Sequence, residues 1–145
     1  MKASAAMKRS LLIFALASLT SIAAVRAADT SATAQATAAS SEWLAVIDAG
    51  EYGKSWDAAA AVLRQNITKP QWERAAGAVR KQTGALKSRE LQSAQPAHEL
   101  PGVPAGDYVV LTYRSSFADA PTATETVTPM READGTWRVA GYYIK

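Results

Sequence analysis

The spacing of apolar residues changes near Gly84, and this change limits the chain to folds in which helices precede a sheet. Before it, large apolar residues recur at every third or fourth position, as at Trp43, Val46 and Ile47, which is the helical period. After it, apolar and polar residues alternate, most clearly in Tyr108–Phe117, as in a half-buried strand. The sequence therefore predicts an α+β domain with about three N-terminal helices packed on a curved antiparallel sheet of about four strands.

The helical part divides at residues that end or begin helices. We expect a first helix from Glu42 to Gly50 and a second over 52–66. The third should run from Thr68 to Gly84, because Thr68 and Gln71 have the spacing of a capping box. The four predicted strands are Ala85–Ser93, Tyr108–Phe117, Thr122–Met130 and Thr136–Ile144, with a Pro/Gly-rich loop at Leu100–Gly106.

The final strand carries a group of aromatic residues that could pack or bind. Neighbouring strand residues point to opposite faces of a sheet. Counting by twos, one face holds Trp137, Val139, Gly141 and Tyr143, and Tyr142 lies on the other. We expect Trp137 and Tyr143 to fill the core against the helices. A ligand-stacking role for Tyr143 is the alternative.

The N-terminus has the three parts of a secretory signal peptide. Lys2, Lys8 and Arg9 precede an uncharged apolar run at Leu11–Ala24, and small residues then favour a cut between Ala27 and Ala28. We expect a signal peptide at 1–27, a low-complexity tether at 28–40 and a single domain at 41–145, periplasmic or secreted. The apolar run is shorter than the roughly 20 residues of a membrane-spanning helix, although an uncleaved anchor stays open.

Charge and composition argue against several classes of function. Four of the 16 basic residues lie in 1–27, which leaves 12 basic and 13 acidic residues in the rest of the chain. A nucleic-acid partner, which needs a concentrated basic face, is therefore not expected. The chain has no cysteine and one histidine, His98, so we expect neither a disulfide nor a metal site, since catalytic zinc typically takes three protein ligands. No cofactor is predicted.

Glu125 is the most informative acidic residue. By alternation it shares a face with Val127 and Pro129, and a carboxylate on an apolar inner face needs a partner. Arg89 or Arg114 could supply it, and a structural ion pair is favoured over a ligand-binding or catalytic role. Asp48, Glu51 and Asp57 are interpreted as structural or solvated charges. The candidate ligand-binding residues are Trp56, Arg89, Tyr113, Glu125 and Tyr143, and no catalytic residue is predicted.

Five blocks of sequence, in order, resemble the bacterial domain-of-unknown-function 4019 family. They are WLAVIDAGEYGKSW, KSRE, ELPGVPAGDYVVLTYRSSF, Glu125 before Thr126-Val127, and DGTWRVAGYYIK, and they cover about Glu42 to Lys145. The resemblance implies a small exported protein and no established activity. The order of elements is also similar to nuclear-transport-factor-2-like and cystatin-like cone folds, which host both enzymes and binding modules.

The function predicted from these features is a non-catalytic, exported binding or interaction domain. It would hold a small apolar ligand in the cone, or a protein partner, including a second copy of itself, through the sheet face. One alternative is a cone-fold hydrolase or isomerase with Glu125 or Asp57 as general base and Tyr113 as proton donor. Another is a structural protein of the cell envelope, tethered by its N-terminal segment.

Overall fold

The computed structural model describes residues 20–145, with side chains from residue 26 onward. The predicted signal peptide lies largely outside these residues. In the described part the order is α1 (Thr20–Asp48), α2 (Tyr52–Asp57), α3 (Ala61–Asn66), α4 (Lys69–Thr83), β1 (Leu86–Ala97), β2 (Tyr108–Phe117), β3 (Ala123–Arg131) and β4 (Trp137–Ile144). The predicted α+β class and the antiparallel sheet are confirmed. Within residues 20–145, no helix is both long enough and apolar enough to span a bilayer.

The helical part contains four helices in the described residues, where the sequence predicted about three. The stretch over 52–66 forms two short helices, because the chain turns at Ala60. There the backbone N–H of Ala60 donates to the carbonyl of Val139 over 2.8 Å and ties the turn to β4. The third predicted helix is confirmed as α4, with the Thr68–Gln71 capping box at its start and Gly84 at its end.

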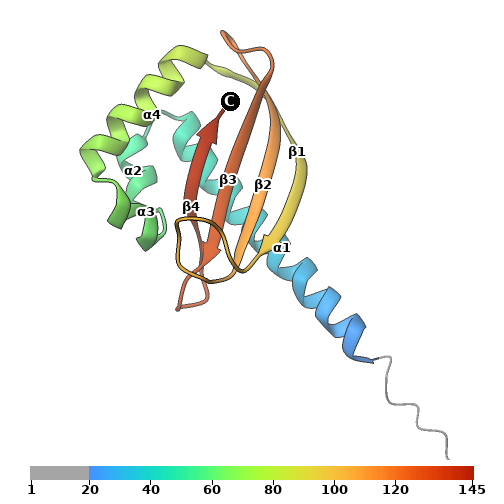
Figure 1. Ribbon diagram of the computed structural model, residues 1–145. Helices are drawn as coiled ribbons and strands as arrows, with labels where there is room; N and C mark the ends of the chain where they lie inside the picture. The colour runs from blue at the N-terminus through green and yellow to red at the C-terminus, as the bar shows by residue number, and fades with distance from the viewer. Residues whose placement is uncertain (1–19) are drawn as a thin grey trace, which may run out of the picture.

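The first helix begins well before the predicted Glu42. α1 is continuous from Thr20 and includes the whole low-complexity stretch 28–40. This stretch lacks Gly and Pro and is rich in Ala, the strongest helix former. The N-terminal part of α1 extends beyond the sheet, whereas its later turns lie against it (Figure 1). Ala36 and Ser40 are fully buried there, so helix packing starts within this stretch.

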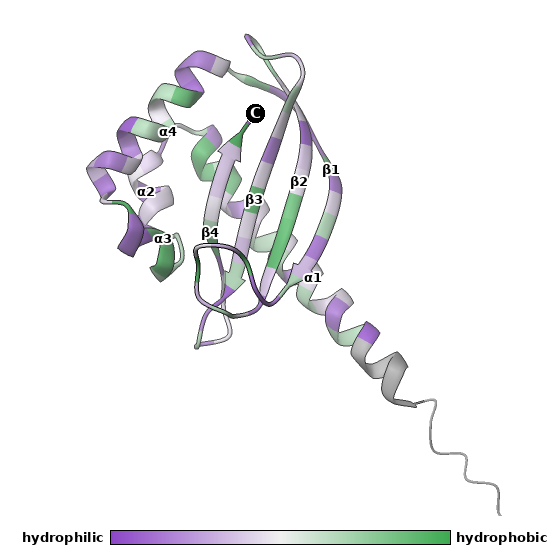
Figure 2. Ribbon diagram, in the orientation of Figure 1, coloured by the Kyte–Doolittle hydropathy of each residue, from purple (hydrophilic) through white to green (hydrophobic). Residues whose placement is uncertain are grey.

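The sheet is an antiparallel meander in the order β1-β2-β3-β4, so β1 and β4 are its edges (Figure 1). β2 has the predicted bounds. β1 continues past the predicted end at Ser93 and through Pro96, which an edge strand tolerates because its outward backbone N–H needs no partner. Figure 2 shows a strongly hydrophobic stretch in β2, while α4 carries many hydrophilic residues.

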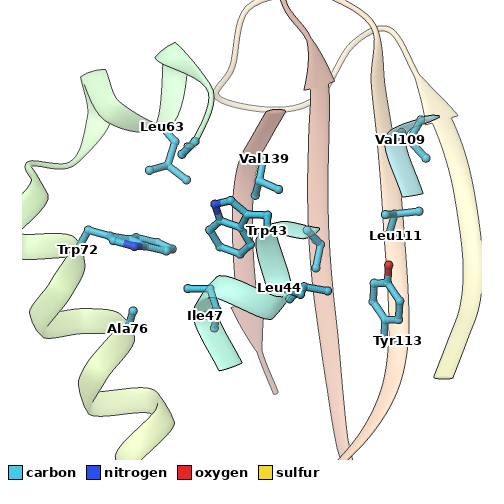
Figure 3. Close-up of a cluster of buried hydrophobic side chains, with 13 residues drawn as sticks. Trp43, Leu44, Ile47, Leu63, Trp72, Ala76, Val109, Leu111, Tyr113 and Val139 are labelled. Carbon is cyan, nitrogen blue, oxygen red and sulfur yellow. The ribbon is translucent and has the colours of Figure 1, made fainter. Parts of the chain in front are cut away.

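Trp43 lies at the centre of the core, between the helices and the sheet. Its indole Nε1 donates to the carbonyl of Ser55 over 2.8 Å. Its ring lies 5.9 Å from that of Trp72 and 5.4 Å from that of Tyr142. Figure 3 shows the neighbouring apolar side chains from α1, α3, α4, β2 and β4 directed into this region. Side chains thus fill the space between α1 and the sheet around Trp43.

The prediction that Tyr143 fills the core is wrong, and a β-bulge is the reason. Thr128 pairs with Gly141, but the next residue, Pro129, pairs with Val139. Ala140 is therefore an extra residue in β4, and an extra residue reverses the alternation of side chains beyond it. Tyr142 packs against the core, and Tyr143 is 49% exposed. Trp137 lies before the bulge and packs against the core as predicted.

Candidate functional site

Glu125 lies near the start of β3, fully buried on the face that packs against α1. Arg89 of β1 is its ion-pair partner, with Nε 2.7 Å from Oε1 and Nη2 3.0 Å from Oε2. Such a bidentate pair is the strongest common form of a charged hydrogen bond. Arg114, the other predicted candidate, pairs instead with Glu90 over 2.6 Å at the exposed surface. The predicted structural ion pair of Glu125 is present.

Two hydroxyl groups complete the environment of the Glu125 carboxylate. Ser115 of β2 donates to Oε1, and Tyr142 of β4 donates to Oε2 over 2.7 Å. The bulge at Ala140 is what directs Tyr142 inward. All four strands therefore contribute a side chain to this one position.

Arg89 also binds a second carboxylate, that of Asp48 at the end of α1. Its Nη1 lies 2.7 Å from Oδ2 of Asp48, and its Nη2 lies 3.0 Å from Oδ1. Arg80 of α4 donates to the same Oδ1 over 2.8 Å, and its guanidinium lies 4.9 Å from the centre of the Phe117 ring. We name this set the buried polar network. It consists of Asp48, Arg80, Arg89, Ser115, Glu125 and Tyr142.

The network keeps its carboxylates charged. Burial raises the pKa of Glu125, but the hydrogen bonds from Arg89, Ser115 and Tyr142 outweigh burial and leave that pKa below its ordinary value. The pKa of Asp48 is lowered in the same way, with burial opposed by Arg89 and Arg80. Burial raises the pKa of Tyr142, and the nearby Glu125 charge raises it further. The network thus combines ionised acids with a protonated tyrosine at neutral pH.

This geometry does not favour Glu125 as a general base. Each of its oxygens already accepts two hydrogen bonds, Oε1 from Arg89 and Ser115 and Oε2 from Arg89 and Tyr142. A general base has to reach a substrate proton directly or through one water, and this carboxylate is fully buried. The arrangement therefore links α1, α4 and the four strands through ion pairs and hydrogen bonds.

The remaining predicted residues lie in different surroundings. Trp56 donates to the carbonyl of Ile67 over 2.9 Å, away from the network. Tyr113 is buried two residues before Ser115, and its hydroxyl has no partner in the described part of the chain. Asp57 pairs with Lys69 at the surface, 2.6 Å apart.

His98 is 83% exposed and lies 3.0 Å from Asp107. Among the described residues, no group of three or more His, Asp or Glu side chains is placed to hold a metal ion.

Comparison with protein families gives one match. The profile of the family described as protein of unknown function (DUF4019) matches residues 39–142. The chain belongs to this family. No curated protein and no solved structure matches the chain. The six residues of the buried polar network all fall inside the matched range, so the network is part of the DUF4019 domain itself.

The surface of the DUF4019 domain has an apolar hollow beside β4. It measures about 150 Å³ and is lined by α4 residues and by Tyr142, Tyr143 and Ile144. Val79 of α4 and Tyr143 are among the exposed large hydrophobic residues, at 40% and 49%. The buried polar network reaches this hollow through Tyr142, whose hydroxyl binds Glu125 and whose side chain forms part of the hollow's wall.

Proposed function

We propose that this DUF4019 domain is a non-catalytic binding domain that receives an extended segment of a partner protein along the free edge of β4. The observation that carries the proposal is an unpaired strand edge beside an apolar hollow. An edge strand with free backbone groups is a template for a further strand, and many peptide-binding domains use it in this way.

The backbone of β4 has free hydrogen-bonding groups at its C-terminal end. Thr124 and Lys145 exchange both of their backbone hydrogen bonds, each 2.9 Å long. Because bonded and non-bonded pairs alternate along antiparallel strands, the N–H and C=O groups of Tyr142 and Ile144 point away from β3. Within residues 20–145, no backbone hydrogen bond occupies these groups. They are available to a strand added beside β4.

The hollow provides a place for a side chain of that added strand. Trp72, Ala76 and Val79 form its wall on α4, and Tyr142, Tyr143 and Ile144 form its wall on β4. Its volume of about 150 Å³ is below the roughly 300–1,000 Å³ of small-molecule pockets. It suits one apolar side chain of a peptide better than a whole ligand. Affinity would come from the main chain of the partner, and specificity from this one anchor.

The other edge of the sheet is less suited to pairing. β1 has two irregularities in its register with β2, one between Leu86 and Ser88 and one between Leu91 and Ser93. It also contains Pro96 and several charged residues. Bulges, proline and charges are the features that protect edge strands from added strands. β4 has a bulge of its own at Ala140, but this bulge lies before the free backbone groups of Tyr142 and Ile144, so we assign the binding edge to the C-terminal end of β4.

Selection of peptides from a random display library against the purified protein tests this proposal. The expected peptides carry one large apolar residue within an extended segment that is rich in β-branched residues. Their affinity should fall about tenfold or more in Val79→Glu, since a charge would enter the apolar hollow. Leu91→Glu is the matched control, because Leu91 is also 40% exposed but lies on β1. Peptides that bind both variants equally would contradict the proposal.

We also propose that the domain works outside the cytoplasm. The supporting feature is the order of charged, apolar and small residues over 1–27. Intact-mass measurement of the protein isolated from the cell envelope and the medium tests it, with a start at Ala28 expected. A chain that keeps Met1 and stays in the cytoplasm would contradict it.

A further inference from the structure

A second hollow lies at the end of the domain where α1, the β1–β2 loop and the ends of β3 and β4 meet. It measures about 210 Å³. Its lining includes Asp29, His98, Asp107 and Arg131 together with the rings of Tyr108 and Trp137. We propose that this hollow binds a small zwitterion, a compound with an ammonium and a carboxylate a few carbons apart. This site is separate from the β4 edge and does not depend on the function proposed there.

The charges around the hollow are of both signs and are incompletely paired. Asp107 lies 3.0 Å from Nδ1 of His98, and a histidine carries charge only when protonated. Neither Asp29 nor Arg131 forms a salt bridge with another residue of the described chain. Two carboxylates are thus available to an ammonium group. One guanidinium is available to a carboxylate, which arginine binds through two parallel hydrogen bonds.

Trp137 gives an independent indication of a missing acceptor. Its indole Nε1 is buried and has no hydrogen-bond partner in residues 26–145. Buried donors without a partner are uncommon in folded proteins, and each calls for an explanation. Because Nε1 is closed off from solvent in this structure, a carboxylate bound to Arg131 would satisfy this donor after the indole edge turns toward the hollow. Arg131 and Trp137 are direct cross-strand partners, which brings the two donors to the same end of the sheet.

The size of the hollow limits the ligand. Pockets for drug-sized ligands measure roughly 300–1,000 Å³, and this hollow measures about 210 Å³. The side chains of Tyr108 and Val109 are buried beside it, so the ligand contacts an apolar surface between its charged ends. A short unbranched amino acid meets these requirements of charge and size.

Titration of the ¹⁵N-labelled protein with three matched probes tests the inference. The probes are 4-aminobutanoate, butylamine and butanoate, which share a chain length and differ in charge. We expect 4-aminobutanoate to shift the indole N–H signal of Trp137 saturably and to bind more tightly than either other probe. Trp137→Phe assigns that signal among the four tryptophans of the chain.

Single-residue variants separate the two charged ends of the site. Arg131→Gln and Asp107→Asn should each weaken binding of 4-aminobutanoate about tenfold, since each removes a charged hydrogen bond. Arg114→Gln, on the exposed Glu90 pair, is the control and should bind as wild type does. Butylamine binding as tightly as 4-aminobutanoate would overturn the inference. So would the absence of any saturable shift, as expected if the protein's own amino terminus fills the hollow.

Discussion

Arg89 binds Glu125 through two parallel hydrogen bonds, from Nε to Oε1 over 2.7 Å and from Nη2 to Oε2 over 3.0 Å. The same guanidinium also binds Asp48. Burying charged groups costs solvation energy, and a buried pair offsets this cost only while both partners are present. Removing Arg89 or one of its carboxylate partners should therefore lower the stability of the DUF4019 domain far more than the number of lost contacts suggests.

Arg89→Met should lower the free energy of unfolding by about 3–5 kcal/mol, because it leaves the fully buried Glu125 without its counter-charge. Urea denaturation followed by circular dichroism measures this change. Arg114→Met is the matched control. Its pair with Glu90 is about two-thirds exposed on both sides, and exposed pairs add little to stability. Equal losses in the two variants would contradict a structural role for the network.

Acidification should destabilise the domain below about pH 4.5. The pKa values of Glu125 and Asp48 are lowered in the folded state from ordinary values of 4.5 and 3.8. A lowered pKa means that the stabilisation is present above the unfolded value and is lost as pH falls through the folded one. Urea midpoints measured from pH 7 down to pH 3 test this. The Glu125→Gln variant should be less stable than the wild type at neutral pH, and it should lose less stability than the wild type on acidification.

Tyr142→Phe should lower the free energy of unfolding by about 1–3 kcal/mol, since it removes one of the two donors to Oε2 of the buried Glu125 carboxylate. The neighbouring variant Tyr143→Phe should have almost no effect, because Tyr143 is 49% exposed. Thermal denaturation of the two variants gives the comparison. A larger loss of stability in Tyr143→Phe than in Tyr142→Phe would show that Ala140 does not form the bulge.

Gly84→Ala should be more destabilising than Gly102→Ala. Both glycines have left-handed backbones, with φ of 76° and 80°, so both substitutions carry the backbone cost of roughly 1–3 kcal/mol. A Cβ on Gly84 would in addition lie close to Asp119 and Ala118, whereas a Cβ on Gly102 would meet open space. Chemical denaturation of both variants measures the difference, and equal losses would contradict the tight contact at Gly84.

The sequence predicted elements well where the local pattern alone decides the structure. β2 places Val109, Leu111, Tyr113 and Phe117 on one face, as predicted, and its predicted bounds match the structure. α4 was predicted from the capping residues Thr68 and Gln71, which interact within one turn. The start of α1 was predicted too late because the Ala, Ser and Thr residues show no amphipathic pattern, although the many Ala residues among them favour a helix.

The site could be predicted only in part. Alternation predicted that Glu125 shares a face with Val127, and the structure shows that this face is the inner one. Alternation within β2 already directs Arg114 away from the face of Tyr113 and Ser115. The position of Arg89 opposite Ser115 depended on the register of β1 against β2, which local periodicity does not contain. Ser115 gave a usable signal, since it is a polar residue between apolar residues on the inner face of β2. Tyr142 gave none, because a bulge of one residue is not visible in the pattern.

The six network residues come from six different elements, and this has a consequence for how the domain opens. If any one of α1, α4 or the four strands detached, it would leave an unpaired charge or donor inside the remaining protein. Partial opening would then cost nearly as much as complete unfolding. The slowly exchanging amide hydrogens of all six elements should therefore give the same free energy of opening, rather than a different value for each element.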